Sequence, residues 1–522
     1  MSFLSLSCRS LLPPWACEIM GFWNNLALGI EVAFTTQNLL YCFLGVTLGN
    51  LMGVVPGVGA VAAVSILLPV TYHIPPSAGL IMLAGLYYGA VYGAVTGAIL
   101  LNIPHTVSAV ECLDGYPMAK SGRAGVALFM TTIASLCGSV VGIVIIALFA
   151  PPVAAVALTF ESPDYFALVV LGMTGAVALA RGSPIRSFIM ILTGMLIGLV
   201  GMDVTSAQPR FTFGISQFMD GISIGVIAMG LFGVAELIAN AGQLHTGTVT
   251  AGDITWRSLL PTRDDLRRSW PAIIRGTGLG CFFGILPGAG AVLASIIAYT
   301  VEKQVAADPG RFGNGAIEGV VAPEAAANAA CQTSFVPMLT LGIPTDPITA
   351  VMLAALLIKG ISPGPEFISA HPDIFWGLVV SFVVGNVLLV IWHIPFIRLW
   401  VKLLTVPFDI LFPSVLVLIC LGVYTIHNST MDILLVLAFG LIGYGMRLLQ
   451  FEPAPLLIGL VLGPLLETYL RRSLIVSHGN VLGLLERPFA GGVLCLSAII
   501  LAWTFRKTAK SSRPNPNSKA AV

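Results

Sequence analysis

Charge is what this sequence has least of. Only 9% of its 522 residues are Asp, Glu, Lys or Arg, whereas about a quarter of the residues in a soluble globular protein are charged. So few charged side chains cannot cover the surface of a soluble chain of this length, and 57% of the residues are hydrophobic. The composition therefore predicts a polytopic membrane protein. A formal net charge of +1, without any Lys/Arg-rich run, excludes a nucleic-acid-binding protein.

Several motifs are missing as well. The nine cysteines are scattered, mostly in apolar stretches, with no CxxC pair, so we expect buried thiols and no metal site. No HExxH motif or paired-histidine arrangement points to an enzyme. No GxxxxGK[ST] phosphate loop is present. We therefore expect no catalytic activity and no cofactor.

Apolar stretches recur along the whole chain and predict an all-α fold of about ten to twelve transmembrane helices with some re-entrant hairpins. Two basic regions interrupt them, the segment 241–270 with four arginines and the tail 506–522. By the positive-inside rule both face the cytoplasm. The segment 241–270 also reads as a linker between a first half, 20–240, and a second half, 271–505. Residues 1–19 make a poor signal peptide, and we expect translation to begin at Met20.

The two halves share one pattern of helix breaks. The first half has GVVPGVGA at 53–60 and an Ile-Pro pair at 103–104, and the second has GILPGAGA at 284–291 and an Ile-Pro pair at 343–344. Each break is followed by small or polar residues. We predict two internal repeats, which we expect to be inverted, with hairpin motifs at 53–70, 102–116, 284–300 and 342–360.

A paired set of breaks at membrane depth indicates a binding site. Irregular backbone survives inside a membrane only where it is packed in protein or lines a wet cavity. Each break starts a half-helix, whose free N–H groups and positive dipole end attract an anion, and glycine lets that anion approach the backbone. Plain proline kinks between packed helices are the alternative. The predicted substrate-binding residues are Pro56, Gly57, Gly59, Asn102, Pro104, His105, Thr106, Ser108, Pro287, Gly288, Gly290, Asn328, Pro344 and Thr345.

Charged residues within apolar stretches are rare here, so each is a candidate. Glu324 would share a helix face with Asn328. It binds a coupling cation or contacts the substrate, or else it marks a helix end near the membrane interface. Asp346 either binds such a cation or caps the next helix. His105 either meets a substrate carboxylate or serves as a hydrogen-bonding filler.

Glycine recurs every fourth residue in GLYYGAVYGAVTGAI (85–99), which predicts one helix face for close packing. Tyr88 and Tyr92, in the same stretch, are candidate cavity liners.

Long motifs in this chain resemble the large membrane subunit of tripartite tricarboxylate transporters, the TctA family. The run 53–128, which opens GVVPGVGAVAAVSILLP, carries the resemblance. Further matches are SPDYFALVVLGM (162–173), RFTFG (210–214), FGNGAIEGVVAPEAAANAA (312–330), LTLGIPTDPITAVMLAALLIKGISPGP (339–365) and PAPLLIGLVLGPLLETYLRRSL (453–474). The similarity extends from about Met20 to Ala498.

The resemblance implies a permease of the bacterial inner membrane that imports carboxylates. Its expected partners are a small four-helix membrane subunit and a periplasmic solute-binding protein, and the membrane complex could pair as a homodimer. Uptake would be driven by a sodium or proton gradient, with an elevator-like movement by analogy with other inverted-repeat carriers. His105 and Thr345 stand where the family usually has glycine, so the substrate is not carried over. A passive anion channel is the main alternative, and a membrane-embedded enzyme is a weaker one.

Overall fold

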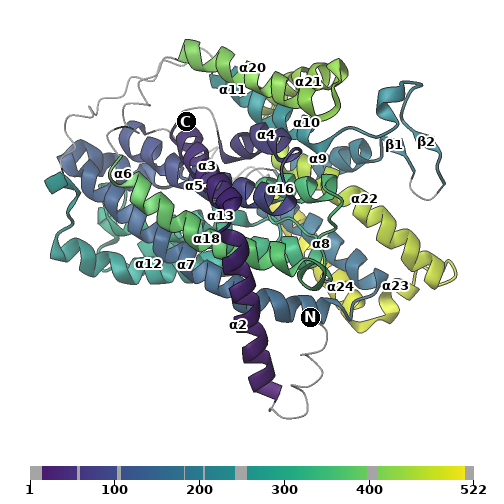
Figure 1. Cartoon of the computed structure of the whole chain (residues 1–522), viewed down its shortest axis with the longest axis horizontal. Helices are drawn as coiled ribbons and strands as arrows, with labels where there is room; N and C mark the ends of the chain where they lie inside the picture. The colour runs from purple at the N-terminus through teal and green to yellow at the C-terminus, as the bar shows by residue number, and fades with distance from the viewer. Residues whose placement is uncertain are drawn as a thin grey trace, which may run out of the picture.

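The protein is almost entirely helical (Figure 1). The computed structural model describes residues 14–55, 59–102, 107–180, 183–203, 206–240, 256–396, 399 and 408–511. Within these ranges the strands are limited to one short antiparallel hairpin, β1 (Gly201–Met202) and β2 (Pro209–Arg210). The predicted all-α fold is confirmed.

The helices of the first half end and begin next to the breaks that the sequence predicts. The N-terminal helix α2 projects from the body on its own (Figure 1). The first set is α2 (Pro14–Ala33), α3 (Thr36–Val54), α4 (Ala60–Thr71), α5 (Pro76–Leu101), α6 (Cys112–Met118), the π-helical turn η1 (Ala119–Arg123) and α7 (Ala124–Ala157). The next set is α8 (Ser162–Leu179), α9 (Pro184–Gly198), the hairpin, the 3-10 turn η2 (Ser216–Phe218), α10 (Ile224–Ala228), η3 (Met229–Val234) and α11 (Ala235–Asn240).

The second half follows a similar order. Its first helix, α12, begins at Arg263, inside the segment predicted as a linker. The elements are η5 (Trp256–Leu259), α12 (Arg263–Ile285), α13 (Gly290–Val305), η6 (Pro309–Arg311), α14 (Glu318–Thr333), α15 (Phe335–Leu341), α16 (Pro347–Ile358), α17 (Phe367–Ala370) and α18 (Pro372–His393). The C-terminal elements are α20 (Phe408–His427), α21 (Thr430–Leu448), α22 (Pro453–Val476), α23 (Gly483–Glu486) and α24 (Pro488–Ser511).

Several helices are long and apolar enough to cross a membrane. In the described ranges there are seven, or eight if the bent pair α2 and α3 forms one span, and five shorter apolar helices accompany them. This number of long spans in the described ranges is below the predicted ten to twelve, because apolar stretches are divided into short helices such as α4, after a Pro-Gly break, and α16, after an Ile-Pro break. The polytopic membrane class is confirmed.

In both halves, the helix before the Ile-Pro pair ends in the same way. Asn102 follows α5 with φ 55°, and Gly342 follows α15 with φ 70°. Each residue immediately precedes an Ile-Pro pair. Glycine and asparagine tolerate this left-handed conformation best, and a following proline cannot continue a helix. This shared ending fits the predicted repeat, which stays a prediction.

Helix α5 forms the centre of the molecule. It packs against α3, α4, α7, α14, α16 and α18. Its glycines 85, 89 and 93 face Gly45, Gly49 and Gly53 of α3, and a methyl group on Gly89 would lie 2.7 Å from the Val46 carbonyl oxygen. The predicted glycine face is thus a close helix–helix contact.

A buried carboxylate joins the two halves. Asp114 of α6 accepts hydrogen bonds from the backbone N–H groups of Gly313, Gly315 and Ala316 at 2.8–2.9 Å, and from the Tyr299 hydroxyl at 2.9 Å. Four donors compensate the loss of water around this carboxylate. The stretch 313–316, which lacks a helix of its own, is thereby fixed against α6.

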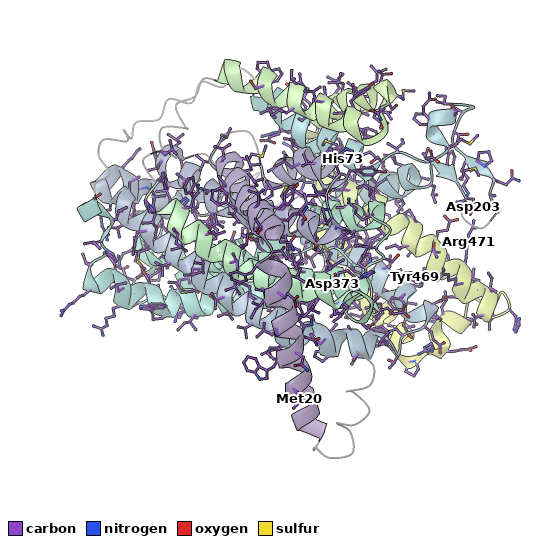
Figure 2. All side chains as sticks on the ribbon, in the orientation of Figure 1. Met20, His73, Asp203, Asp373, Tyr469 and Arg471 are labelled. Atoms are coloured by element: carbon purple, nitrogen blue, oxygen red, sulfur yellow. The ribbon has the colours of Figure 1, made fainter. Side chains whose placement is uncertain are left out.

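Ion pairs fasten the β-hairpin to α22. Asp203 pairs with Arg210 and, at 3.1 Å, with Arg471, while Glu467 pairs with both arginines. Figure 2 shows Asp203 and Arg471 close together at the end of the molecule that carries the hairpin. The network holds the hairpin against α22 although the strands contribute only two residues each.

Candidate functional site

The helix breaks of both halves meet at one cavity of about 1290 Å³. Its wall includes the start of α4 from the first half and the starts of α13 and α16 from the second. Residues from α5, α8, α9, α21 and α22 complete it. The predicted residues that line it are Gly59, Asn102, Gly288, Gly290, Thr345 and Asp346.

Four of the other predicted residues lie elsewhere. Ser108, Pro287, Pro344 and Asn328 do not belong to the cavity wall as described. Ser108 and Asn328 are buried between helices, and Pro287 packs against Gly175 of α8. The positions Pro56, Gly57, Pro104, His105 and Thr106 lie outside the described residues.

Two helix N-termini open into the cavity without a cap. The residue before α4 is Gly59 and the residue before α13 is Ala289, and no described side chain caps either helix. The first residues of both helices line the cavity. Uncapped N–H groups and the positive ends of two helix dipoles make this wall a donor surface for an anion.

The third N-terminus, that of α16, is already occupied. The Asp346 carboxylate accepts the Thr349 N–H at 2.8 Å, and the Thr349 hydroxyl accepts the Thr345 and Asp346 N–H groups at 3.1 and 3.0 Å. This reciprocal capping box satisfies the donors that a substrate anion would need. The structure therefore shows Asp346 as the helix cap, the second of its two interpretations, and leaves its role as a cation ligand a prediction.

The tyrosine at the cavity is Tyr87. Its hydroxyl donates to Asp346 Oδ2 at 2.6 Å. Tyr87, Ala90, Val91 and Ala94 line the cavity and lie on one face of α5 by their spacing. Tyr88 and Tyr92, which the sequence offered only as candidate cavity liners beside the packing interpretation, are not in the described wall. The glycine face fixes the rotation of α5 and turns these tyrosines toward Phe382 and His393 of α18.

An arginine that the sequence interpretation missed also faces the cavity. Arg186 of α9 donates from Nη1 to the Leu449 and Gln450 carbonyl oxygens at 3.1 and 3.2 Å. No acidic partner of Arg186 occurs among the ion pairs of the described chain, whereas Arg447, also on the wall, pairs with Glu236 at 2.8 Å. Arg186 thus places a positive charge on the wall of the same cavity that the two open helix ends line.

The glycines at the breaks serve two different purposes. A methyl group on Gly59 would meet no atom of the described residues within 4 Å, so this position is open toward them. At Gly288, φ is 81° and a methyl group would lie 2.6 Å from the Gly175 carbonyl carbon; at Gly290, φ is 55° and the nearest atom would be Asp346 Cβ at 2.9 Å. Local packing and left-handed backbone demand glycine at 288 and 290, whatever a ligand requires.

Glu324 lies in a separate buried cluster. It is 1% exposed, six residues inside α14, and its Oε1 accepts from Asn328 Nδ2 at 2.8 Å and from the Ser135 hydroxyl. The predicted shared helix face of Glu324 and Asn328 is confirmed, and an interfacial helix-end position does not fit this burial. Neither residue lines the cavity as described.

Comparison with known proteins gives a consistent picture. A family model described as "Tripartite tricarboxylate transporter TctA family" matches residues 39–458. The chain is 45% identical over 487 residues to the "Uncharacterized 52.8 kDa protein in TAR-I ttuC' 3'region" of Agrobacterium vitis, covering 93% of this chain and 97% of the relative. It is also 45% identical over 234 residues to the "Uncharacterized protein in TAR-II ttuC' 3'region" of the same organism, covering 45% and 97% respectively. No solved structure matches.

Proposed function

Since the chain belongs to the tripartite tricarboxylate transporter TctA family, whose members are transporter membrane subunits, we propose that it is the large permease subunit of a carboxylate importer. The substrate is a dicarboxylate or tricarboxylate, and the membrane is the bacterial inner membrane. A periplasmic solute-binding protein delivers the substrate, and a small four-helix membrane subunit completes the complex.

One observation carries this proposal: two uncapped helix N-termini, one from each half, face the same cavity together with Arg186. Each helix end offers backbone donors to one carboxylate, and a guanidinium binds a further carboxylate with two parallel hydrogen bonds. A substrate with two or three carboxylates fits a wall that has three such places. A monocarboxylate would leave one or two of them unused.

Transport is secondary, with a sodium or proton gradient as the energy source and no cofactor. The paired helix breaks from both halves support an elevator-like movement, by analogy with inverted-repeat carriers. A passive anion channel would also suit helix dipoles, but it has no need of an outside binding protein.

The test is uptake of labelled carboxylates by cells that contain this chain, the small subunit and the binding protein. We expect accumulation against a gradient that requires the binding protein and is abolished when the driving ion gradient is collapsed. Equilibration without accumulation would identify a channel, and no uptake of any carboxylate would refute the proposal.

A variant at Gly59 tests the helix-terminus site itself. Gly59→Val adds a side chain at the start of α4, where a Cβ would meet no described atom within 4 Å. We expect about a tenfold weaker apparent affinity, equivalent to about 1.4 kcal/mol, because the valine covers the free N–H groups. Gly278→Val is the matched control, since Gly278 is equally open but lies on α12 outside the cavity wall. Unchanged affinity in Gly59→Val would remove α4 from the site.

A further inference from the structure

One exposed face of α12 changes from basic to apolar along its length. It carries, in this order, Arg263, Arg267, Trp270, Ile274 and Ile285. Their spacing places all five on one side of the helix. Trp270 is 48% exposed and Ile274 is 68% exposed, and α12 lies along an edge of the body (Figure 1). These five residues are called the α12 stripe below.

The opposite face of α12 fixes the direction of the stripe. Gly276 and Gly280 are buried on that face, and a methyl group on either one would overlap with the carbonyl oxygen of Ala322 or Ala326 in α14. Such close backbone contact does not allow α12 to rotate about its axis. The stripe therefore points away from the protein.

The two arginines of the stripe form no ion pair with another described residue. The acidic side chains of the first helical turn, Asp264 and Asp265, pair with other arginines at 2.7 and 2.6 Å. Arg263 is also the first residue of α12, where the positive end of the helix dipole opposes a cation. Neither a local ion pair nor helix stability thus explains the two charges, and an anion from outside the chain would complement them.

The order of residues along the stripe matches the depth profile of a membrane surface. Tryptophan prefers the boundary between headgroups and hydrocarbon. At 1.5 Å per residue, Arg267 lies about 4.5 Å before Trp270 and Arg263 about 10 Å before it, and the headgroup layer is about 5–7 Å thick on each side. The arginines would thus stand at the level of the phosphates, and Ile274 and Ile285 would face the acyl chains. A phospholipid supplies both chemistries at once, whereas a protein partner would have to place acids and apolar side chains at the same two depths.

We propose that the α12 stripe binds an anionic phospholipid of the leaflet that the positive-inside rule assigns to the cytoplasmic side. Its phosphate lies on Arg263 and Arg267, since a guanidinium binds phosphate with two parallel hydrogen bonds. Its glycerol region lies beside Trp270, and its chains cover Ile274 and Ile285. The stripe does not belong to the cavity wall as described, so the inference goes beyond the proposed function and holds for any substrate. The bound lipid would keep the start of α12 at the membrane surface.

Native mass spectrometry of the purified full chain in a nonionic detergent tests the site without any transport assay. The probe is dioleoyl phosphatidylglycerol, titrated against dioleoyl phosphatidylcholine, and the readout is the fraction of protein that carries one lipid. We expect phosphatidylglycerol to reach half-saturation at a concentration at least about fivefold lower, because only this lipid brings a net negative charge to the arginines. The preference should shrink as the salt concentration rises.

Variants assign the preference to the stripe. The double variant Arg263→Gln/Arg267→Gln should need about 25-fold more phosphatidylglycerol, about fivefold for each arginine, with phosphatidylcholine binding unchanged. The double variant Arg263→Lys/Arg267→Lys keeps the charge and should retain most of the preference. Arg472→Gln is the matched control, because Arg472 is another exposed arginine but lies on α22, and it should bind phosphatidylglycerol like the wild type.

Several results would overturn the lipid site. Equal binding of the two lipids by the wild type would do so, as would an unchanged phosphatidylglycerol requirement in the double glutamine variant. If that variant does not fold, unchanged lipid binding in Trp270→Ala overturns the site instead. Displacement of phosphatidylglycerol by equimolar inorganic phosphate would reduce it to a plain anion site. Loss of the co-purifying small membrane subunit from the glutamine variant, with lipid binding intact, would assign this face to a protein.

Discussion

The substitution Gly288→Ala is expected to destabilise the protein strongly, although it adds a single methyl group. Gly288 has φ 81°, and the added Cβ would lie 2.5 Å from Ala176 Cα and 2.6 Å from the Gly175 carbonyl carbon. The left-handed backbone costs a non-glycine residue about 1–2 kcal/mol, and overpacking costs about 1–3 kcal/mol. We therefore expect a loss of about 2–5 kcal/mol, since both obstacles are backbone atoms of α8 that cannot rotate away.

The assay is thermal unfolding of the purified variant in detergent, with its yield in the membrane as a second measure. A fall in melting temperature of roughly 2–5 °C is expected, because the unfolding entropy of a chain of this length corresponds to about 1 °C per kcal/mol. Gly278→Ala is the control, because a methyl group there meets nothing within 4 Å and the residue lies inside α12, where alanine is at least as favourable as glycine. A Gly288→Ala protein with wild-type melting behaviour would refute the packing argument. The position could then be assigned to ligand approach alone.

Two further variants test single contacts. Tyr87→Phe removes the hydrogen bond to Asp346 Oδ2, which is part-buried at the cavity wall, and should lower stability by about 0.5–1.5 kcal/mol, the net contribution of one hydrogen bond; a melting temperature equal to the wild type would contradict this. Burial opposes ionisation of Asp265, but hydrogen bonds from Arg123 and Thr262 outweigh it and hold the pKa of Asp265 below its usual 3.8. The ionised Asp265 carboxylate therefore contributes to the stability of the fold above pH 3.8. This contribution is lost as the pH falls through the lower pKa of Asp265 in the folded state. Asp265→Asn should thus be less stable than the wild type by about 1 kcal/mol at neutral pH, with a difference that shrinks near pH 3 in denaturation curves; a constant difference would refute the assignment.

The sequence is a good guide to where the helices break. Proline and glycine act on their own backbone, so the motifs at 53–60 and 284–291 locate the ends of α3 and α12 and the starts of α4 and α13. The four-residue spacing of Gly85, Gly89 and Gly93 likewise predicts a close helix contact. Both signals are local and need no knowledge of which partner helix is nearby.

Contacts between distant segments could not be predicted in this way. Tyr87 rather than Tyr88 reaches the cavity because the rotation of α5 depends on α3, which the tyrosines themselves do not reveal. Arg186 became a candidate only when α9 was found beside the end of α21. A glycine at 288 is equally consistent with ligand approach and with helix packing, and only the position of Gly175 distinguishes the two.

The carboxylate of Asp114 has a mechanical consequence. It belongs to the first half of the chain, yet its four hydrogen bonds go to Tyr299 and to the stretch 313–316 of the second. Ser295 of α13 adds another such bond, to the Val107 carbonyl oxygen at 3.1 Å. If the first half moved as one body against the second, all of these hydrogen bonds would have to break in each transport cycle. Under the proposed elevator-like movement, the moving part would therefore combine pieces of both halves, and the division between moving and static bodies would not follow the division of the sequence.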